Sequence, residues 1–135
     1  MRVILDTNIW ISFLIGHHLP EIRMIVTDNR FEVIVCPQLI SEVVDVANRD
    51  KIRKYISSSD TSDLLRIIRA FCKNVEIETD AVSEIRDPKD LYLLSLAEKV
   101  DAIYIVSGDA DLTSLGRHAN TKIITLAEFR ELYLK

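Results

Sequence analysis

The sequence predicts an α/β fold organised around a mostly parallel sheet. Short runs of branched apolar residues, clearest at residues 3–5, are typical of strands buried on both faces of such a sheet. Amphipathic helical patterns separate these runs, and this alternation is typical of an α/β sandwich. Acidic side chains follow two of the runs, Asp6 directly and Asp109 after two residues, which places charge at the ends of core strands.

The apolar pattern divides the chain into five strands joined by helices. The strands are expected at residues 3–5, 31–35, 75–78, 102–106 and 122–125. The runs at 3–5 and 102–106 should be buried, whereas 75–78 alternates in polarity, which suits an edge position.

Helices are expected wherever apolar residues recur at helical spacing. Gly16 ends the first helix, Pro37 and Pro88 suit first helical positions, and Ser57 begins a segment with N-cap chemistry. A short helix should also begin behind Asp111. The longer helices are expected at residues 9–15, 21–27, 38–48, 51–56, 64–73, 88–100 and 126–134.

A chain of 135 residues with 48% apolar content has the size and hydrophobicity of one ordinary domain, covering 1–135. No low-complexity tract or repeat marks a linker. The longest apolar runs are too short to cross a membrane, and the first strand begins where a signal peptide would lie. We therefore expect a cytoplasmic protein without a membrane partner, in which Cys36 and Cys72 stay reduced.

Two acids are placed where they could reach the ends of the strands. Asp6 ends the first strand, at the edge of an α/β sheet where ligands bind. Thr7 and Asn8 after it suit a helix start, so Asp6 could equally be an N-cap. Glu42 lies at the margin of its helix's apolar arc, next to Val46. A charge there is also common in purely structural helices, so both interpretations stay open.

Asp90 is the most informative acid because it falls inside an apolar arc. On a helical wheel it lies between Leu94 and Ala97, where an unpaired charge costs on the order of several kcal/mol or is lost by protonation. A bound cation would compensate this charge. The alternative is a capping box with Asp87, although Glu or Gln is the usual residue at that position.

Asp109 and Asp111 follow the strand at 102–106 within the turn at 107–111. Gly108 permits a tight turn that brings carboxylates close to a ligand. Two aspartates at a helix start are also good caps, so a structural role stays open.

These acids can converge, because right-handed crossovers bring the carboxyl ends of parallel strands to one edge. Grouped carboxylates repel one another unless a cation lies between them. Oxygen ligands without His or Cys select Mg²⁺ or Mn²⁺ over Zn²⁺. Such a cluster suits metal-assisted hydrolysis of a phosphodiester.

The formal net charge of −4 at first argues against a nucleic-acid partner. Setting aside the five acids of the expected site leaves a formal charge of +1, so the acidity is local. Two basic groupings remain, each typical of an ordinary solvated helix face. They are Lys51, Arg53 and Lys54, and Arg66, Arg69 and Lys73.

The acids lie in recognisable segments: LDTN at 5–8, the helical Glu42, RDPKD at 86–90 and SGDAD at 107–111. Together these segments resemble the PIN-domain family, particularly its VapC-like toxin ribonucleases, over essentially the whole chain. The resemblance implies a PIN-like three-layer α/β/α sandwich with a five-stranded, mostly parallel sheet. It also implies a Mg²⁺- or Mn²⁺-dependent endoribonuclease that cuts RNA.

Carried over by position, the resemblance also implies roles for individual residues. The catalytic acids would be Asp6, Glu42, Asp90 and Asp109. The metal ligands would be Asp6, Asp90, Asp109 and Asp111. The polar residues supporting them would be Thr7, Asn8 and Ser107. Proteins of this kind often form homodimers, and a small antitoxin inhibits them by inserting a basic side chain into the acidic pocket.

Two other functions are compatible with these residues. A phosphotransferase of the haloacid-dehalogenase type would use Asp6 as nucleophile and Asp109 as metal ligand. It requires a second Asp where Asn8 stands, and it leaves Glu42 unexplained. A catalytically silent RNA- or protein-binding PIN module would use the acids to bind a structural metal or a basic partner.

Overall fold

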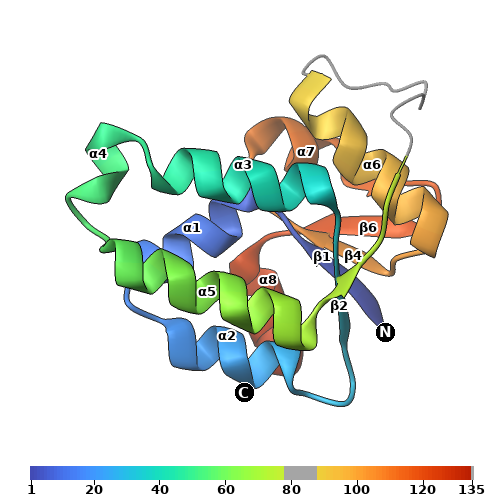
Figure 1. Ribbon diagram of the computed structural model, residues 1–135. Coiled ribbons are helices and arrows are strands. Elements are labelled where there is room, and N and C mark those ends of the chain that lie inside the picture. Colours follow the sequence, from blue (N-terminus) through green and yellow to red (C-terminus); the bar gives the residue numbers. More distant parts are fainter. Residues whose placement is uncertain (78–87, 135) are drawn as a thin grey trace.

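A six-stranded sheet forms the centre of the structure (Figure 1). The structure is a computed structural model that describes residues 1–77 and 88–134, and only the backbone of 88–90. The strands are β1 (Arg2–Leu5), β2 (Glu32–Val35), β3 (Lys73–Asn74), β4 (Tyr104–Val106), β5 (Arg117–His118) and β6 (Thr121–Ile124). The helices are α1 (Thr7–Ile15), α2 (Leu19–Val26), α3 (Pro37–Ala47), α4 (Asp50–Arg53), α5 (Ser58–Phe71), α6 (Pro88–Val100), α7 (Ala110–Leu115) and α8 (Leu126–Tyr133).

The strands follow the order β3-β2-β1-β4-β6-β5, and all neighbouring pairs are parallel except β5 with β6. The predicted mostly parallel sheet is therefore confirmed. In the central pair, Leu5 of β1 lies opposite Val106 of β4. The backbone amide of Asp6 donates to the Val106 carbonyl at 2.9 Å. This register makes the two strands end side by side.

Helices cover the sheet as an α/β/α sandwich predicts. The strand order runs one way across the sheet from β1 to β3 and the other way from β4 to β6. Crossovers of one hand therefore place helices on both faces. Helices α1, α2, α3 and α5 pack together, as Figure 1 shows, and α6 packs on β1 and β4.

The first strand is fixed in the core, and the first helix is bonded to its end. Val3, Ile4 and Leu5 expose none of their surface, as expected for a central strand. Trp10 of α1 is also fully buried, and its indole nitrogen donates to the Leu5 carbonyl at 2.9 Å. This bond holds the start of α1 against the end of β1.

The outer strands differ from the predicted ones. The strand expected at 75–78 is wrong: β3 pairs with the end of β2 through Lys73 and Asn74, and 75–77 form no strand. Residue 78 lies outside the described residues. The sheet has six strands and not the predicted five, because it includes β5, a two-residue antiparallel partner of β6 that the sequence did not predict. Strands of two residues are too short to show an alternating pattern.

Within the described ranges, no helix is both long and apolar enough to span a bilayer. Cys36 and Cys72 are both free thiols, as predicted.

The bond between α1 and β1 predicts a measurable loss of stability. Replacing Trp10 with Phe leaves the Leu5 carbonyl without the indole donor and opens a cavity, so the free energy of unfolding should fall by about 2 kcal/mol. Urea denaturation measures this change. Met24→Ala, at a side chain with 67% of its surface exposed, should change stability by less than about 0.5 kcal/mol. Similar losses in both variants would contradict this role of Trp10.

Candidate active site

The predicted site lies where the chain reverses its direction across the sheet. The crossover from β1 leads to β2 on one side, while β4 lies on the other side of β1. In open α/β sheets, ligands bind in the crevice at the carboxyl ends of two such strands. Asp6 follows β1, and Ser107 and Asp109 follow β4. The topology therefore brings segments about one hundred residues apart to one place.

Asp6 is buried, with 5% of its surface exposed, and it combines two roles. Its Oδ1 accepts from the Thr7 amide at 2.6 Å, which caps α1. Its Oδ2 accepts from the Ser107 hydroxyl at 2.7 Å and from the Asn8 side-chain amide at 3.2 Å. The N-cap interpretation and the site interpretation therefore describe the same carboxylate.

Asn8 and Ser107 bond the two loops of the site to each other. The Asn8 Oδ1 accepts from the Gly108 amide at 3.0 Å, and the Ser107 hydroxyl donates to Asp6. Within its own loop, the Ser107 Oγ also accepts from the Asp109 amide at 3.0 Å. The tight turn expected of Gly108 is not what the structure shows. Gly108 has no positive φ, and an added Cβ would meet Asn8 Oδ1 at 3.5 Å, an ordinary contact.

Glu42 reaches the same region from α3 through Tyr92 of α6. The Tyr92 hydroxyl donates to Glu42 Oε2 at 2.5 Å and lies 3.4 Å from the Thr7 Oγ1. Tyr92 is buried, and both burial and its bond to the Glu42 carboxylate raise the pKa of its phenol. The neutral hydroxyl therefore links three elements of the site: α1, α3 and α6.

The two acids after β4 lie in different surroundings. Asp109 is half-buried, and its Oδ1 accepts from the Asp111 amide at 2.8 Å, so that it caps α7. Asp111 is exposed, and no hydrogen bond joins its side chain to the other acids in the described part of the chain. Its role as a metal ligand stays a prediction.

The third predicted acid falls at the edge of the described structure. Pro88 is the first residue of α6, as expected, and Asp90 lies in the first turn of that helix. The side chain of Asp90 and the whole of Asp87 lie outside the described residues. Whether Asp90 faces the other acids or forms the capping box is therefore not tested.

The carboxylate of Asp6 is disfavoured in its charged form by its surroundings. Burial raises the pKa of Asp6 above its ordinary value of 3.8, and the nearby carboxylates of Glu42 and Asp109 raise it further. The hydrogen bonds from Ser107 and Thr7 act in the opposite direction but do not cancel the effect. A charge disfavoured by both burial and like-charged neighbours is one that a cation would stabilise.

The donor set fits a hard divalent cation. A carboxylate offers about four lone-pair positions. Three donors occupy three of those positions on Asp6, which leaves about one for a cation. Glu42 and Asp109 would add further oxygen ligands, with neither His nor Cys among them. Across the described side chains, no three acidic, His or Cys residues are grouped closely enough to hold an ion.

Tyr92 is the site residue that the sequence did not reveal. It lies in the helix predicted at 88–100, and its side chain is buried. The signal available was its hydroxyl, because a buried Tyr usually needs a hydrogen-bond partner.

Comparison with known proteins identifies the family. The sequence model of the PIN-domain family matches residues 2–111, a range that includes every acid discussed above. The chain therefore belongs to the PIN-domain family, as the sequence motifs predicted. A search of curated proteins gave no significant match.

Two solved structures show the same fold. The PIN domain of human SMG5 has a TM-score of 0.60 at 19% identity, covering 98% of this chain and 100% of that one. A chain of VapBC2 from Rickettsia felis, solved bound to a DNA fragment from its promoter, has a TM-score of 0.55 at 12% identity. That match covers 93% of this chain and 98% of the other.

The environment of Asp6 predicts the direction of its titration. In metal-free protein, NMR of the Asp6 carboxyl should give a pKa above 3.8, which Glu42→Gln lowers and Ser107→Ala raises. Protonation of Asp6 stabilises the folded state relative to the unfolded state. This stabilisation is fully present below pH 3.8, the ordinary pKa, and is lost as the pH rises through the raised pKa of the folded state. Asp28, whose pKa Arg30 lowers by hydrogen bonding, is an internal reference. An Asp6 pKa at or below that of Asp28 would contradict the crowded site.

The bond between Tyr92 and Glu42 predicts energetic coupling. Tyr92→Phe removes a buried donor to a carboxylate and should lower the free energy of unfolding by about 1.5 kcal/mol. In a double-mutant cycle with Glu42→Gln, we expect a coupling energy of about 1 kcal/mol. Tyr55→Phe, at an exposed tyrosine, is the matched control and should have no effect. Strict additivity of Tyr92→Phe and Glu42→Gln would show that the bond contributes nothing.

Proposed function

We propose that this chain is a Mg²⁺- or Mn²⁺-dependent endoribonuclease that hydrolyses RNA phosphodiesters at the acidic edge of its sheet. The observation that carries the proposal is the environment of Asp6. Asp6 is a buried carboxylate at the topological switch point, and Ser107 from the loop after β4 donates to its Oδ2 at 2.7 Å. Burial raises its pKa most, and the carboxylates of Glu42 and Asp109, which come from distant segments, raise it further. Structural capping of α1 requires neither neighbour.

In this proposal the metal ligands are Asp6, Asp90, Asp109 and Asp111, and Glu42 completes the catalytic acids. When bound, the ion would supply a water-derived nucleophile and neutralise charge on the phosphate. The remaining work is done by protein groups. Thr7, Asn8 and Ser107 support the first carboxylate, and Tyr92 fixes the direction in which Glu42 points.

The biological setting is proposed on likeness of fold. The VapBC2 structure is that of a protein complex bound to promoter DNA, which supports a small antitoxin as partner of this chain. RNA as substrate, a homodimer and a cytoplasmic location belong to the same proposal.

A phosphotransferase is less well supported than a nuclease. That reaction needs an acid at Asn8 to protonate the leaving group, but Asn8 carries an amide that bridges Asp6 and Gly108. Tyr92 and Glu42 would also have no role in it. A silent binding module would keep the same fold and acids but cleave nothing.

The proposal predicts metal-dependent cleavage. Purified protein should cut single-stranded RNA in gel assays, EDTA should stop the reaction, and Mg²⁺ or Mn²⁺ should restore it. Asp90→Asn should abolish cleavage while leaving the melting temperature equal or higher, because it relieves repulsion among the acids. The matched control is Glu98→Gln, at an exposed acid on the same helix as Asp90, which should cut normally.

Three results would decide against this account. Intact RNA across varied substrates with metal present would favour the silent module. Unfolding of Asp90→Asn would show that its carboxylate is a cap instead of a ligand. A covalent phosphate on Asp6, absent in Asp6→Asn, would favour the phosphotransferase.

A further inference from the structure

Cations crowd the short helix α4 and the residues on either side of it. In a protein with a formal net charge of −4, residues 49–54 carry +3, with one acid, Asp50. The cations, all exposed, are Arg49, Lys51, Arg53 and Lys54. These four residues together with Tyr55 are named the cationic tip.

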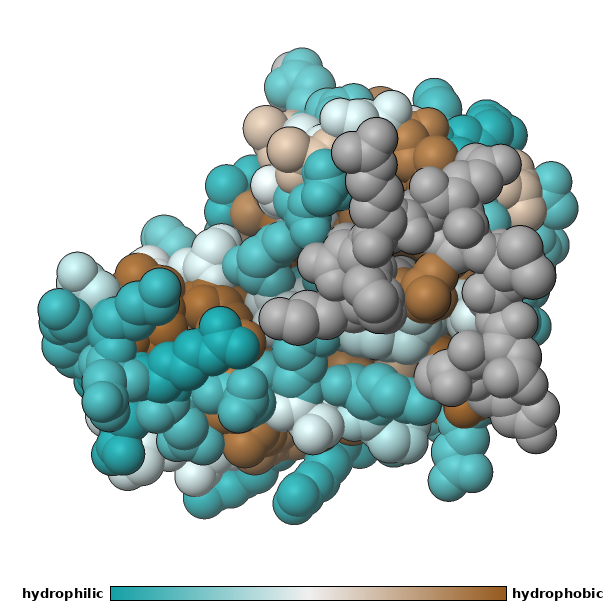
Figure 2. All heavy atoms as spheres, turned by 90° about the horizontal axis from the view of Figure 1, so that it is seen from above, coloured by the Kyte–Doolittle hydropathy of each residue, from teal (hydrophilic) through white to brown (hydrophobic). Residues whose placement is uncertain are grey.

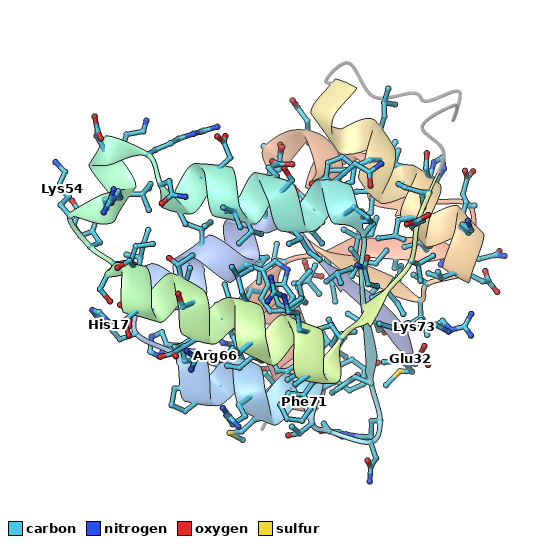
Figure 3. The ribbon with its side chains drawn as sticks, in the orientation of Figure 1. His17, Glu32, Lys54, Arg66, Phe71 and Lys73 are labelled. Atoms are coloured by element: carbon cyan, nitrogen blue, oxygen red, sulfur yellow. The ribbon has the colours of Figure 1, made fainter. Side chains whose placement is uncertain are left out.

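Most of these cations have no carboxylate partner. Arg49 pairs with the exposed Asp45 at 3.3 Å. In the described ranges, Lys51, Arg53 and Lys54 form no ion pair. Figure 3 shows Lys54 at the free end of α4, directed away from the body of the molecule. Three positive charges are therefore available to an anionic partner.

The second basic grouping, on α5 and β3, is different. Arg66 lies 3.4 Å from Asp63, and Lys73 lies 3.5 Å from Glu32. Figure 3 shows Lys73 and Glu32 side by side at the opposite end of α5 from the cationic tip. These pairs reduce the charge that the grouping offers to a ligand.

An exposed aromatic ring accompanies the free cations. Tyr55 exposes 55% of its surface, while the next residue, Ile56, exposes 5%, and Ile52 packs against the core. The apolar neighbours thus anchor the segment and leave the tyrosine in solvent. Sites that bind single-stranded nucleic acids combine cations with accessible aromatic rings. The phosphates contact the cations, and an unpaired base stacks on the ring.

The cationic tip is close to the acidic edge. Helix α3 carries Glu42 and ends at Ala47, two residues before the tip begins at Arg49, and it rises about 7.5 Å from Glu42 to its end, at ~1.5 Å per residue. Figure 1 shows α3 leading directly to α4, and Figure 2, seen from above, shows mostly hydrophilic residues at the α4 end of this face. Without a bound ion the acids repel phosphate, so the affinity of the metal-free protein for RNA must come from cations outside the site.

We infer that the cationic tip is a docking surface for single-stranded RNA, whose strand it positions along α3 toward the acidic edge. The inference rests on the proposed function. Its contacts are with phosphates and one stacked base, so it contributes affinity without reading sequence. A duplex would leave Tyr55 without an unpaired base to stack on.

Fluorescence anisotropy of a labelled oligouridine 12-mer in EDTA tests this surface without requiring cleavage. The triple variant Lys51→Gln, Arg53→Gln, Lys54→Gln should bind at least about tenfold more weakly and reduce the salt slope by about 2. Tyr55→Leu should weaken binding about fivefold, while Tyr55→Phe should bind normally. The matched control removes three cations elsewhere: Arg66→Gln, Arg69→Gln, Lys73→Gln. It should bind like the unchanged protein, and all variants should keep its melting temperature.

Equal weakening by both triple variants would show that only net charge matters and would overturn the inference. Binding unchanged by the cationic-tip variant would overturn it too, even if the unchanged protein cuts RNA with metal, in which case the proposed function stands. If binding depends on the cationic tip but no cleavage occurs with metal, the inference holds and the proposed function fails. If the cationic-tip variant loses binding to phosphatidylserine vesicles but binds RNA normally, the surface belongs to a membrane contact instead.

Discussion

The parallel pairing of β1 with β4 is the constraint on which the candidate site depends. These strands are neighbours in the sheet although about one hundred residues separate them in the chain. Their register makes them end together, so that the Ser107 hydroxyl donates to the Asp6 carboxylate. Asn8 then bonds to the backbone of the loop after β4. A slip in this register would separate the contacts that join the two loops, from Ser107 to Asp6 and from Gly108 to Asn8.

The same pairing explains why Asp6 is both a structural and a functional candidate. An N-cap needs one oxygen, and Asp6 uses Oδ1 for that purpose. The second oxygen is held in a buried region beside two other acids, where its charge is disfavoured. The hydrogen bonds of the fold therefore fix the position of the carboxylate, but they stabilise its charge less than burial and the neighbouring acids disfavour it. A divalent ion would provide the missing stabilisation.

Much of the fold could be predicted because the central strands are apolar and the helices have clear periodicity. The strand at 3–5 and its terminal Asp6 are the clearest case, and the start of α6 at Pro88 is another. The outer strands β3 and β5 could not be predicted, because pairing with a neighbour defines them and two residues carry no pattern. Tyr92 was missed because a helical wheel shows which face is buried but not where a hydroxyl finds its partner.

The central claim is that carboxylates from separate segments hold one divalent ion at the ends of β1 and β4. Paramagnetic broadening by Mn²⁺ in amide NMR spectra measures this most directly, because it reports distance from the ion and needs no substrate. The account predicts that substoichiometric Mn²⁺ first broadens the amides of Thr7, Asn8, Gly108 and Asp109, and that Asp90→Asn weakens this effect. Broadening confined to other acids such as Asp28 and Asp45, or uniform over the surface, would contradict it.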